Sequence, residues 1–481
     1  MLKRILVSVL VAASVFSFAA CSKGNTKIDT PVVNTDNIQT DANENNGEID
    51  YLSDLSKERY DGYNFRILIR KDHLADQYLE EDSEDLVESA TYRRNKLVED
   101  MYGITITGSE SEHNNYDTSA LNSILAGDDA YDIIFTHSRA AFSYAVQGAC
   151  INFNEVESIH LDKPWWTRDI TDSCSINGRL FVLDGDISSE SLGATMCMLF
   201  NKRIFDELGY DYPYEMVLDD EWTFDEFAYL AKKGSADLNG DGVISAPDDR
   251  FGYISSQWQA PMNMLYTGGQ KIYNKNDEGV LELTLYSNKT VEIYDEYFSL
   301  ISNEACLLGT ESKPHGGGEV FKEGRAMFTD SELRMAELHR DMDDDFGIIP
   351  YPKFDEDDVY GTAANGGTHL LIMPITVSDV ERTGAITEAL CAIGSRDVIP
   401  AFYEQSLKTK YTRDDDSEAM IDLIRATRLF DLGYVAGGTF QSCGKDLANS
   451  ESHDFASYYA KGESAALSKL AEFNRDYGGI E

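Results

Sequence analysis

The sequence has few of the residue patterns that mark disulfide-rich domains or zinc enzymes. Its seven cysteines include no CxxC and no close pair, and its eight histidines form no HExxH motif and no Cys/His cluster. In a chain of this length, scattered cysteines are typical of small buried apolar side chains. We therefore expect free thiols or at most one disulfide after Cys21, and the sequence gives no support for a catalytic zinc site.

Basic residues are also scarce. The chain has 41 Lys and Arg against 85 Asp and Glu, a formal net charge of −44 at pH 7. Such a charge repels polyanions, so nucleic acid is excluded as an expected partner. The hydrophobic fraction of 42% and the aromatic fraction of 11% are those of a globular protein, and the region 51–481 is long enough to predict two lobes.

Long apolar runs are absent after the N-terminus. There, Lys3 and Arg4 precede the uncharged stretch 5–20, which is typical of an export signal and too short for a comfortable membrane span. The sequence FAAC ending at Cys21 resembles the lipobox of bacterial lipoproteins. We expect residues 1–20 to be removed and Cys21 to be lipidated, which predicts an extracytoplasmic protein anchored to the bacterial cell membrane; an ordinary signal peptide with a chance cysteine is the alternative.

The segment 21–50 is predicted to be a flexible tether. It has no aromatic residue from 22 to 50 and is rich in Asn, Asp and Thr. Such a composition cannot bury enough apolar surface to offset the entropy of ordering the chain. The folded part is therefore expected to begin at Tyr51.

The first part of the folded region alternates between strand and helix patterns. NFRILI (64–69), GITITG (103–108) and YDIIF (131–135) are predicted strands, with helical patterns between them at 86–101 and 120–125. This order predicts an α/β fold with a largely parallel sheet, and helical runs at 377–393 and 415–429 predict a helical C-terminal part. Ligands bind at the carboxyl ends of such strands. The residues following the third strand are therefore candidate ligand contacts, although Ser138 suits a helix N-cap equally well: Thr136, His137, Ser138 and Arg139.

The order of motifs along the chain resembles the family 1 extracellular solute-binding proteins of bacterial ABC importers. The motifs, in order, are AYDIIF, DKPWW, NGRLFVLDGDI, MLFNKRIFDELGYDYP, EWTFDEF, FKEGRAMF, FGIIPYPKFDEDDVYGT and LIMPIT. The resemblance implies a two-lobe, periplasmic-binding-protein-like fold of type II, similar in plan to maltose-binding protein, with three interlobe crossings. It also implies a monomer without catalytic residues or an organic cofactor, which closes on a sugar and delivers it to the permease subunits.

The resemblance also suggests lobe boundaries and binding residues. Lobe 1 is predicted to comprise 51–188 and 330–368, and lobe 2 to comprise 189–329 and 369–481. The crossings are expected near 188–190, 329–332 and 365–369. Because a sugar presents hydroxyl groups and an apolar face, we expect aromatic and polar residues to contact it. The candidates are Trp258 in lobe 2, Trp165 after DKP, and Glu190, Asp330, Glu332, Asn365 and His369 at the crossings.

A calcium-type loop lies at 237–248, in the sequence DLNGDGVISAPD. Its oxygen ligands at alternate positions around Gly242 match the ligand spacing of an EF-hand loop. We expect a structural Ca²⁺ ion rather than a sensor, because sensor EF-hands come in pairs. Position 12 of the loop is Asp248 rather than Glu, so Asp249 is a possible ligand in its place. A turn without a bound metal is the alternative. The predicted ligands are Asp237, Asn239, Asp241, the Val243 carbonyl, Ser245 and Asp248.

Two other functions remain open from the sequence. A lipid-anchored surface glycosidase needs two carboxylates across a cleft. Because the chain has 85 acidic residues, candidate pairs of carboxylates are easy to find in the sequence and do not by themselves indicate a glycosidase. No GxSxG or P-loop motif supports an enzyme of those classes. An adhesive lipoprotein without a transport function is the other alternative, and the absence of internal repeats argues against it.

Overall fold

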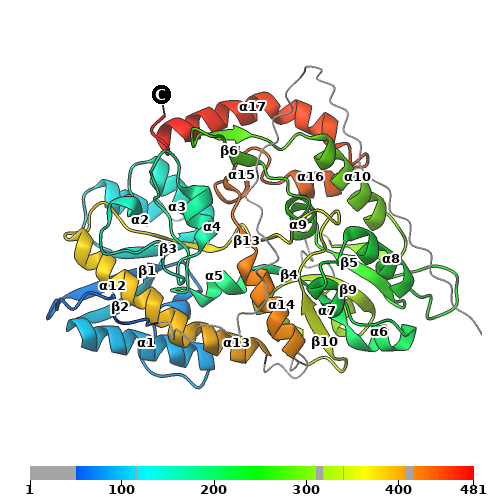
Figure 1. Ribbon diagram of the computed structural model, residues 1–481, viewed down its shortest axis with the longest axis horizontal. Helices are drawn as coiled ribbons and strands as arrows, with labels where there is room; N and C mark the ends of the chain where they lie inside the picture. Colours follow the sequence, from blue (N-terminus) through cyan, green and yellow to red (C-terminus); the bar gives the residue numbers. More distant parts are fainter. Residues whose placement is uncertain (1–49, 114–117, 310–317, 340, 408–414, 481) are drawn as a thin grey trace, which may run out of the picture. The chain divides into compact units, whose positions relative to one another are not determined.

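The computed structural model describes residues 50–113, 118–309, 318–339, 341–407 and 415–480 (Figure 1). The predicted export signal, Cys21 and nearly all of the predicted tether lie outside these residues. In the described part of the chain, no helix combines the length and the apolar character needed to cross a membrane.

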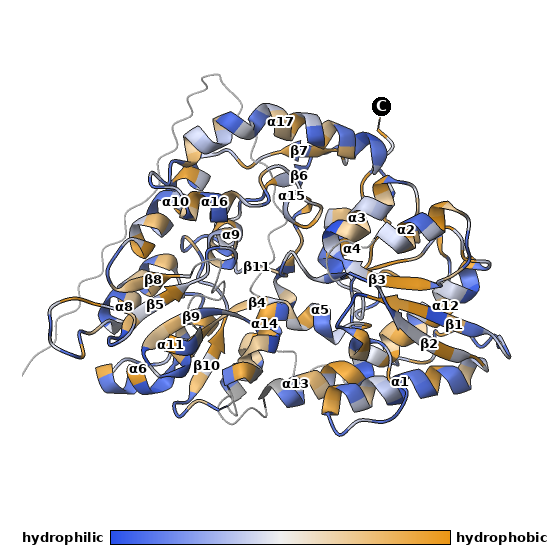
Figure 2. Cartoon of the chain, turned by 180° about the vertical axis from the view of Figure 1, so that it is seen from behind, coloured by the Kyte–Doolittle hydropathy of each residue, from blue (hydrophilic) through white to orange (hydrophobic). Residues whose placement is uncertain are grey.

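The first lobe is built on a four-stranded sheet in the order β12-β3-β1-β2. β1 is parallel to both β2 and β3, and β12 is antiparallel to β3. Helices α2 and α3 lie on one side of the sheet and α1 on the other (Figures 1 and 2). The elements are β1 (Asn64–Ile69), β2 (Thr105–Glu110), β3 (Ile133–His137), β12 (His369–Ile372), α1 (Leu86–Tyr102), α2 (Thr118–Leu125), α3 (Ser138–Val146) and α12 (Val380–Ile393).

Helix α1 shows how local sequence sets an element. Its N-cap, Asp85, accepts hydrogen bonds from the amides of Val87 and Glu88, which satisfies two donors that a helix start leaves open. Gly103 ends the helix in the left-handed conformation, with φ 71°, where a residue without Cβ is favoured. These local signals explain why the predicted and observed bounds of this helix nearly coincide.

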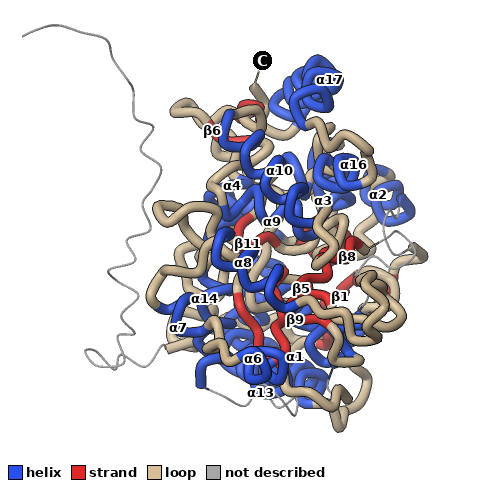
Figure 3. The backbone as a smooth tube through the Cα atoms, turned by 90° about the vertical axis from the view of Figure 1, so that its right-hand side faces the viewer, coloured by secondary structure: helices blue, strands red, loops and turns tan. Residues whose placement is uncertain are grey.

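The second lobe is built on a five-stranded mixed sheet in the order β10-β4-β9-β5-β8. β4 is antiparallel to β10 and β9, whereas β5 is parallel to β9 and β8. Helix α8 lies along β5 and β9 (Figure 3). The elements are β4 (Met196–Asn201), β5 (Phe251–Ser255), β8 (Cys306–Leu308), β9 (Ala326–Glu332), β10 (Phe346–Ile349) and α8 (Phe224–Gly234).

The remaining elements are mostly helical, and β6 pairs with β7 and β11 with β13. The helical C-terminal part agrees with the prediction. The strands are β6 (Tyr273–Lys275), β7 (Leu281–Leu283), β11 (Thr362–Ala363) and β13 (Arg428–Leu429). The α-helices are α4 (Arg168–Cys174), α5 (Ser189–Gly193), α6 (Lys202–Leu208), α7 (Tyr214–Leu218), α9 (Gln259–Thr267), α10 (Asn288–Ile301), α11 (Gly318–Lys322), α13 (Ile399–Leu407), α14 (Asp415–Ala426), α15 (Leu432–Val435), α16 (Cys443–Ala448) and α17 (Phe455–Asp476). Short 3-10 helices are η2 (Leu74–Asp76), η3 (Phe153–Glu155) and η4 (Leu333–His339), and η5 (Gly394–Val398) is a π-helix.

The path of the chain between the sheets differs from the prediction at one crossing. The chain leaves the first sheet before α5 and returns to it between β11 and β12, near the crossings expected at 188–190 and 365–369. After β9, however, η4 leads to β10 in the same sheet, so the crossing expected at 329–332 is wrong. Farther along the chain, α13 packs on α1 of the first lobe, whereas α14 packs on β10 of the second.

The sheet membership of two strands also corrects the predicted lobe boundaries. β10 belongs to the second sheet although 330–368 was assigned to lobe 1, and β12 belongs to the first sheet although 369–481 was assigned to lobe 2. Both strands are short and fully buried. Their residues therefore show no alternation that could indicate which sheet they join.

The interior of both lobes is apolar. Figure 2 shows apolar residues along β3 and β1, and every residue of β3 and of β4 is buried. The six cysteines in the described residues are buried and free, as their spacing predicted: Cys150, Cys174, Cys197, Cys306, Cys391 and Cys443.

Candidate functional site

A cavity of about 330 Å³ lies among residues of both lobes and of the connection before β12; we call it the cleft cavity. It is the place where side chains from widely separated parts of the sequence converge. Its lining is Arg70, His137, Arg139, Ser256, Trp258, Gln259, Asn365, Gly366, Gly367 and Tyr434. Four of these, His137, Arg139, Trp258 and Asn365, were predicted from the sequence.

The first lobe contributes the carboxyl ends of two parallel strands. Arg70 directly follows β1, and His137 is the last residue of β3. His137 caps α3, since its Nδ1 accepts the amide hydrogen of Arg139 at 3.2 Å. Burial, together with the nearby Arg70 and Arg139, lowers the pKa of His137 to about 3, so its imidazole is neutral at physiological pH.

The second lobe contributes the turn between β5 and α9. The Ser256 hydroxyl accepts the amide hydrogens of Trp258 and Gln259, each at 3.2 Å. The Ser256 amide in turn donates to the carboxylate of Asp330, which also accepts from the hydroxyls of Tyr253 (2.7 Å) and Tyr351 (3.0 Å). The buried Asp330 therefore positions the turn that carries Trp258.

Asp330 was predicted as a ligand contact, and the structure places it behind the cavity. Its side chain is buried on β9, and its oxygens are occupied by the three donors described above. Burial raises the pKa of Asp330 to about 7, against the opposing effect of those hydrogen bonds. Its position follows from strand alternation, which the sequence pattern did not resolve on this fully buried strand.

The connection 365–367 is held from several sides. The Ser138 hydroxyl donates to the Gly366 carbonyl at 2.6 Å, and Arg70 donates to the Gly367 carbonyl. The hydroxyl of Tyr434 accepts the Gly366 amide hydrogen at 3.2 Å. A Cβ atom at Gly366 would lie 3.0 Å from the Tyr434 ring, so a larger residue here would require this ring to shift by a few tenths of an ångström.

Glu332 links this connection to the second lobe. One carboxylate oxygen accepts from Gln259 Nε2 at 2.9 Å and from Asn365 Nδ2 at 2.6 Å, and the other pairs with Arg334 at 2.8 Å. Glu332 is 1% exposed and does not line the cleft cavity. It therefore orients two of the lining side chains and is not itself placed to contact a ligand.

Glu190 and His369 lie in a neighbouring polar cluster. Glu190 pairs with Arg334 and lies 3.4 Å from His73 Nδ1. His369 is 4.0 Å from Asp76, and its ring meets that of His73 edge to face, with centroids 4.5 Å apart. Burial is the main cause that lowers the pKa of both His73 and His369. Neither predicted residue lines the cleft cavity.

Three other predicted contacts are structural. Trp165 is 2% exposed, and its indole N–H donates to Glu388 at 3.1 Å, while Trp166 donates to the other Glu388 oxygen at 2.8 Å. The prediction that Trp165 faces the cleft is therefore wrong, because the buried carboxylate of α12 satisfies both indoles. Thr136 is buried within β3, and the Ser138 hydroxyl donates its hydrogen bond to the Gly366 carbonyl.

Six lining residues were missed by the sequence analysis: Arg70, Ser256, Gln259, Gly366, Gly367 and Tyr434. Arg70 had a usable signal, because it follows the strand 64–69 at the same sheet edge as His137. Ser256 and Gln259 flank Trp258 and were not considered with it. Tyr434 had no local signal, because it reaches the cavity through tertiary packing of α15.

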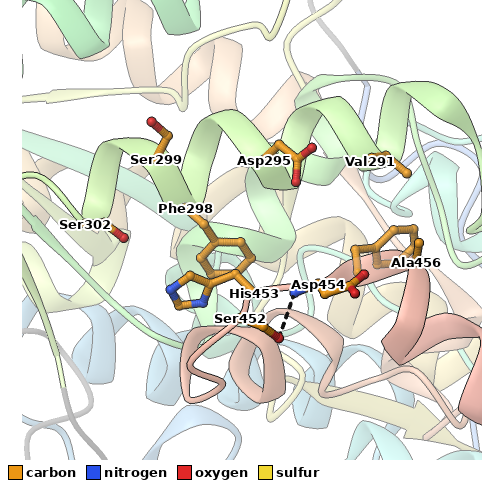
Figure 4. A pocket seen from close by; sticks show the side chains of 10 residues that line it. Val291, Asp295, Phe298, Ser299, Ser302, Ser452, His453, Asp454 and Ala456 are labelled. Carbon is orange, nitrogen blue, oxygen red and sulfur yellow. Dashed lines mark hydrogen bonds between the residues drawn. The ribbon is translucent and has the colours of Figure 1, made fainter.

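A second cavity of about 410 Å³, the outer cavity, lies between α10 and the segment 452–456 (Figure 4). Figure 4 shows Phe298 beside His453, and the two rings stack with centroids 4.6 Å apart. Asp454 accepts the amide of Ser457 and so caps α17. His453 likewise serves the local structure, since its Nδ1 is 2.7 Å from the Leu447 carbonyl oxygen. The outer cavity is nevertheless larger than the cleft cavity.

The predicted calcium loop has the expected turn. Asp237 accepts the amides of Gly240 (2.6 Å) and Gly242 (2.7 Å), and Gly242 has φ 84°. Asp248 is exposed, whereas Asp249 is buried and accepts the amides of Leu238 and Ser245. Asp249 thus holds the loop closed. The oxygen atoms of the loop are the type of ligand that calcium prefers. Within the described residues, however, no three Asp, Glu, His or Cys side chains are grouped to hold a metal ion. Calcium binding therefore stays a prediction.

Comparison with known proteins establishes the fold. No family model matches the sequence, and no curated protein matches it. The structure is similar to an ABC substrate-binding protein from Listeria monocytogenes in complex with cycloalternan, with a TM-score of 0.53 and 15% identity over 87% of this chain and 100% of that chain. It is also similar to a cyclic α-maltosyl-1,6-maltose binding protein from Arthrobacter globiformis, with a TM-score of 0.55 and 12% identity over 87% and 98% of the two chains.

A third solved structure shows the same architecture with a different ligand. UgpB from Mycobacterium tuberculosis, in complex with glycerophosphocholine, has a TM-score of 0.55 and 15% identity over 86% of this chain and 98% of that chain. At these identities the similarity concerns the fold. The chain therefore has the two-lobe α/β fold of periplasmic binding proteins, as the sequence predicted.

Proposed function

We propose that this protein is the solute-binding component of an ABC importer and that it captures a carbohydrate in the cleft cavity. The observation that carries this proposal is the convergence of both lobes and their connection on one cavity, with the partly exposed ring of Trp258 in its wall. An aromatic ring beside polar side chains suits the apolar face and hydroxyl groups of a sugar. The fold shared with proteins solved with oligosaccharides is consistent with this function.

The proposed mechanism is closure of the two lobes on the sugar, followed by transfer to the permease. The protein then acts as a monomer without catalysis, held at the extracytoplasmic face of the membrane by lipid on Cys21. Polar residues such as Gln259 and Asn365 would hold the ligand, and Trp258 would stack on it. Closure replaces an open cleft by a closed one, so ligand binding should reduce the radius of gyration in small-angle X-ray scattering.

A screen of glycans by thermal shift and native mass spectrometry tests the function. A binding protein is stabilised by its sugar and returns it chemically unchanged. Recovery of cleaved saccharide would instead support the glycosidase alternative. Failure of every saccharide to bind would contradict the proposed function and leave an adhesive lipoprotein as the alternative.

Membrane attachment has a separate test. Cys21→Ala should release the protein from the membrane fraction into the soluble fraction, because it removes the lipidated side chain. Cys174→Ala is a suitable control, since Cys174 is buried and free. A Cys21→Ala variant that stayed in the membrane fraction would contradict the lipid anchor.

A further inference from the structure

The cleft cavity has a cationic lining in a strongly acidic protein. The chain carries a formal net charge of −44, yet the described residues that line this cavity include Arg70 and Arg139 and no Asp or Glu. A third cation lies nearby, since the Lys445 ammonium is 4.2 Å from the centroid of the Trp258 ring. The charged side chains of the lining are therefore opposite in sign to the net charge of the whole molecule, and the nearby carboxylate of Glu332 is paired with Arg334.

Arg139 differs from Arg425 and Arg428 in its ion pairing. Arg425 pairs with Asp186 at 2.7 Å and Arg428 with Asp184 at 3.1 Å. Arg139 forms no ion pair with any described carboxylate, and its Nε is buried without a hydrogen-bond partner. Leaving a buried donor of a charged group without a hydrogen bond costs free energy. The Arg139 guanidinium is therefore suited to donate to an acceptor atom of a bound ligand.

The lowered pKa of His137 is a second sign of the positive charge around the cleft cavity. Besides burial, the causes that lower its pKa are its cationic neighbours Arg70 and Arg139 and the nearby His369. Burial, and after it the charge of Arg334, lowers the pKa of Arg70 to about 10, which still leaves Arg70 charged at neutral pH. An anion in the cavity would relieve the repulsion among these groups.

Two helices begin at the cavity, one from each lobe. Arg139 lies in the first turn of α3, and Trp258 and Gln259 begin α9; each helix has nine residues. The N-terminus of a helix carries partial positive charge, so both helices add to the attraction for an anion. Gln259 supplies an acceptor as well, because it is 3% exposed and its Oε1 has no hydrogen-bond partner among the described residues.

We propose that the ligand of the cleft cavity is an acidic saccharide, whose carboxylate or sulfate group accepts hydrogen bonds from Arg139. A ring hydroxyl would donate to Gln259 Oε1, and the apolar face of a sugar ring would lie on Trp258. This inference rests on the proposed function and narrows its substrate class. Neutral sugars match the site less well, because they would leave the cationic lining uncompensated.

The test is calorimetric titration with matched pairs of saccharides. The acidic members are oligosaccharides of galacturonate, glucuronate, mannuronate and guluronate and sulfated chondroitin and heparin disaccharides; each is paired with its neutral or desulfated counterpart. We expect an acidic member to bind at least tenfold more tightly than its counterpart. The uronate and sulfate arms identify which anionic group is recognised.

Each other outcome has a distinct meaning. Binding of neutral members alone would overturn the acidic ligand and leave the proposed function intact. Binding of glycerol phosphate or inorganic sulfate, with no saccharide bound, would overturn the carbohydrate function itself. No binding by any member would count against both.

Variants of Arg139 test the contact directly. Arg139→Gln should weaken binding of the acidic saccharide by about tenfold to a hundredfold, with little change in affinity for any neutral member, because a charge-assisted hydrogen bond is lost. Arg139→Lys should recover part of the loss, since it keeps the charge but lacks the planar fork. Arg93→Gln is the control, because Arg93 is largely exposed on α1. Unchanged affinity of Arg139→Gln, with unchanged melting temperature, would remove Arg139 from the site and overturn the proposal.

Discussion

The cleft cavity and the outer cavity differ in how their polar groups are used. The outer cavity is larger, about 410 Å³ against about 330 Å³, but its lining comes from α10 and one nearby segment, and Asp454 is committed to capping α17. The cleft cavity draws on five separate stretches of the chain and keeps a donor of Arg139 and an acceptor of Gln259 unpaired. Convergence and unused hydrogen-bonding capacity, rather than volume, therefore distinguish the candidate binding site.

The largest expected effect concerns the outer cavity and should appear in stability. Phe298 is 3% exposed and packs against Tyr294, Tyr297 and His453. Phe298→Ala should lower the free energy of unfolding by about 3–5 kcal/mol, as removal of a core aromatic does. Denaturant unfolding measures this loss, and ligand affinity of the folded fraction should stay unchanged.

Asp295→Ala examines the outer cavity without a packing loss, because Asp295 is exposed. It should alter neither stability nor affinity appreciably. If either variant weakened ligand binding while the protein stayed folded, the outer cavity would have to be considered the binding site.

The buried carboxylate behind the cleft cavity predicts a pH dependence of stability. The pKa of Asp330 rises from 3.8 to about 7 on folding, so the folded state binds its proton more tightly than the unfolded state. Stability should fall as pH rises from about 4 to about 7 and then level off, by at most about 4 kcal/mol from this group. Urea unfolding at several pH values measures the slope.

Asp330→Asn separates this contribution from the general repulsion of an acidic protein, which acts in the same direction. The variant should show a shallower fall in stability between pH 4 and pH 7 than the wild-type protein. Equal slopes in the two proteins would show that Asp330 is ionised throughout this range.

Trp258→Ala should weaken ligand binding and leave stability almost unchanged, which is the reverse of the result expected for Phe298→Ala. Trp258 is only half-buried in the cleft cavity, so its removal should weaken ligand binding by about 1–3 kcal/mol, a tenfold to hundredfold rise in dissociation constant. The melting temperature without ligand should change little. A destabilised variant with wild-type affinity would instead place Trp258 in the core and remove it from the site.

Calcium should have the smallest effect and act on neither cavity. At a free concentration ten times its dissociation constant, calcium should stabilise the folded state by about 1.4 kcal/mol, seen as a modest rise in melting temperature. Asp241→Ala should abolish the rise, whereas Asp277→Ala in the exposed β6–β7 turn should not. A calcium-dependent ligand affinity that Asp241→Ala removed would indicate a regulatory site.

The local elements could be predicted because their signals are local. The strand expected at 64–69 has those bounds in the structure, and the helix expected at 86–101 extends by one residue. Apolar periodicity and caps act over a few residues, so they can be read directly. Sheet membership of β10 and β12 depends on partners far along the chain, and two equally buried short strands give no local sign of their partners.

The candidate site could be predicted only in part, for the same reason. His137 and Arg139 follow from the rule on strand ends, and Arg70 would have followed from the same rule. The two tryptophans of DKPWW could not be assigned from sequence, because the deciding partner is Glu388, more than two hundred positions later. Tyr434 likewise reaches the cavity by packing alone.

The position of the connection 365–367 has a consequence for ligand exchange. This stretch passes between the lobes and also lines the cleft cavity, where Gly366 lies against Tyr434. Under the proposed function, any rotation of the lobes moves part of the cavity wall itself. The rate of ligand release should therefore follow the rate of lobe opening, and substitutions at Gly366 that alter one rate should alter the other.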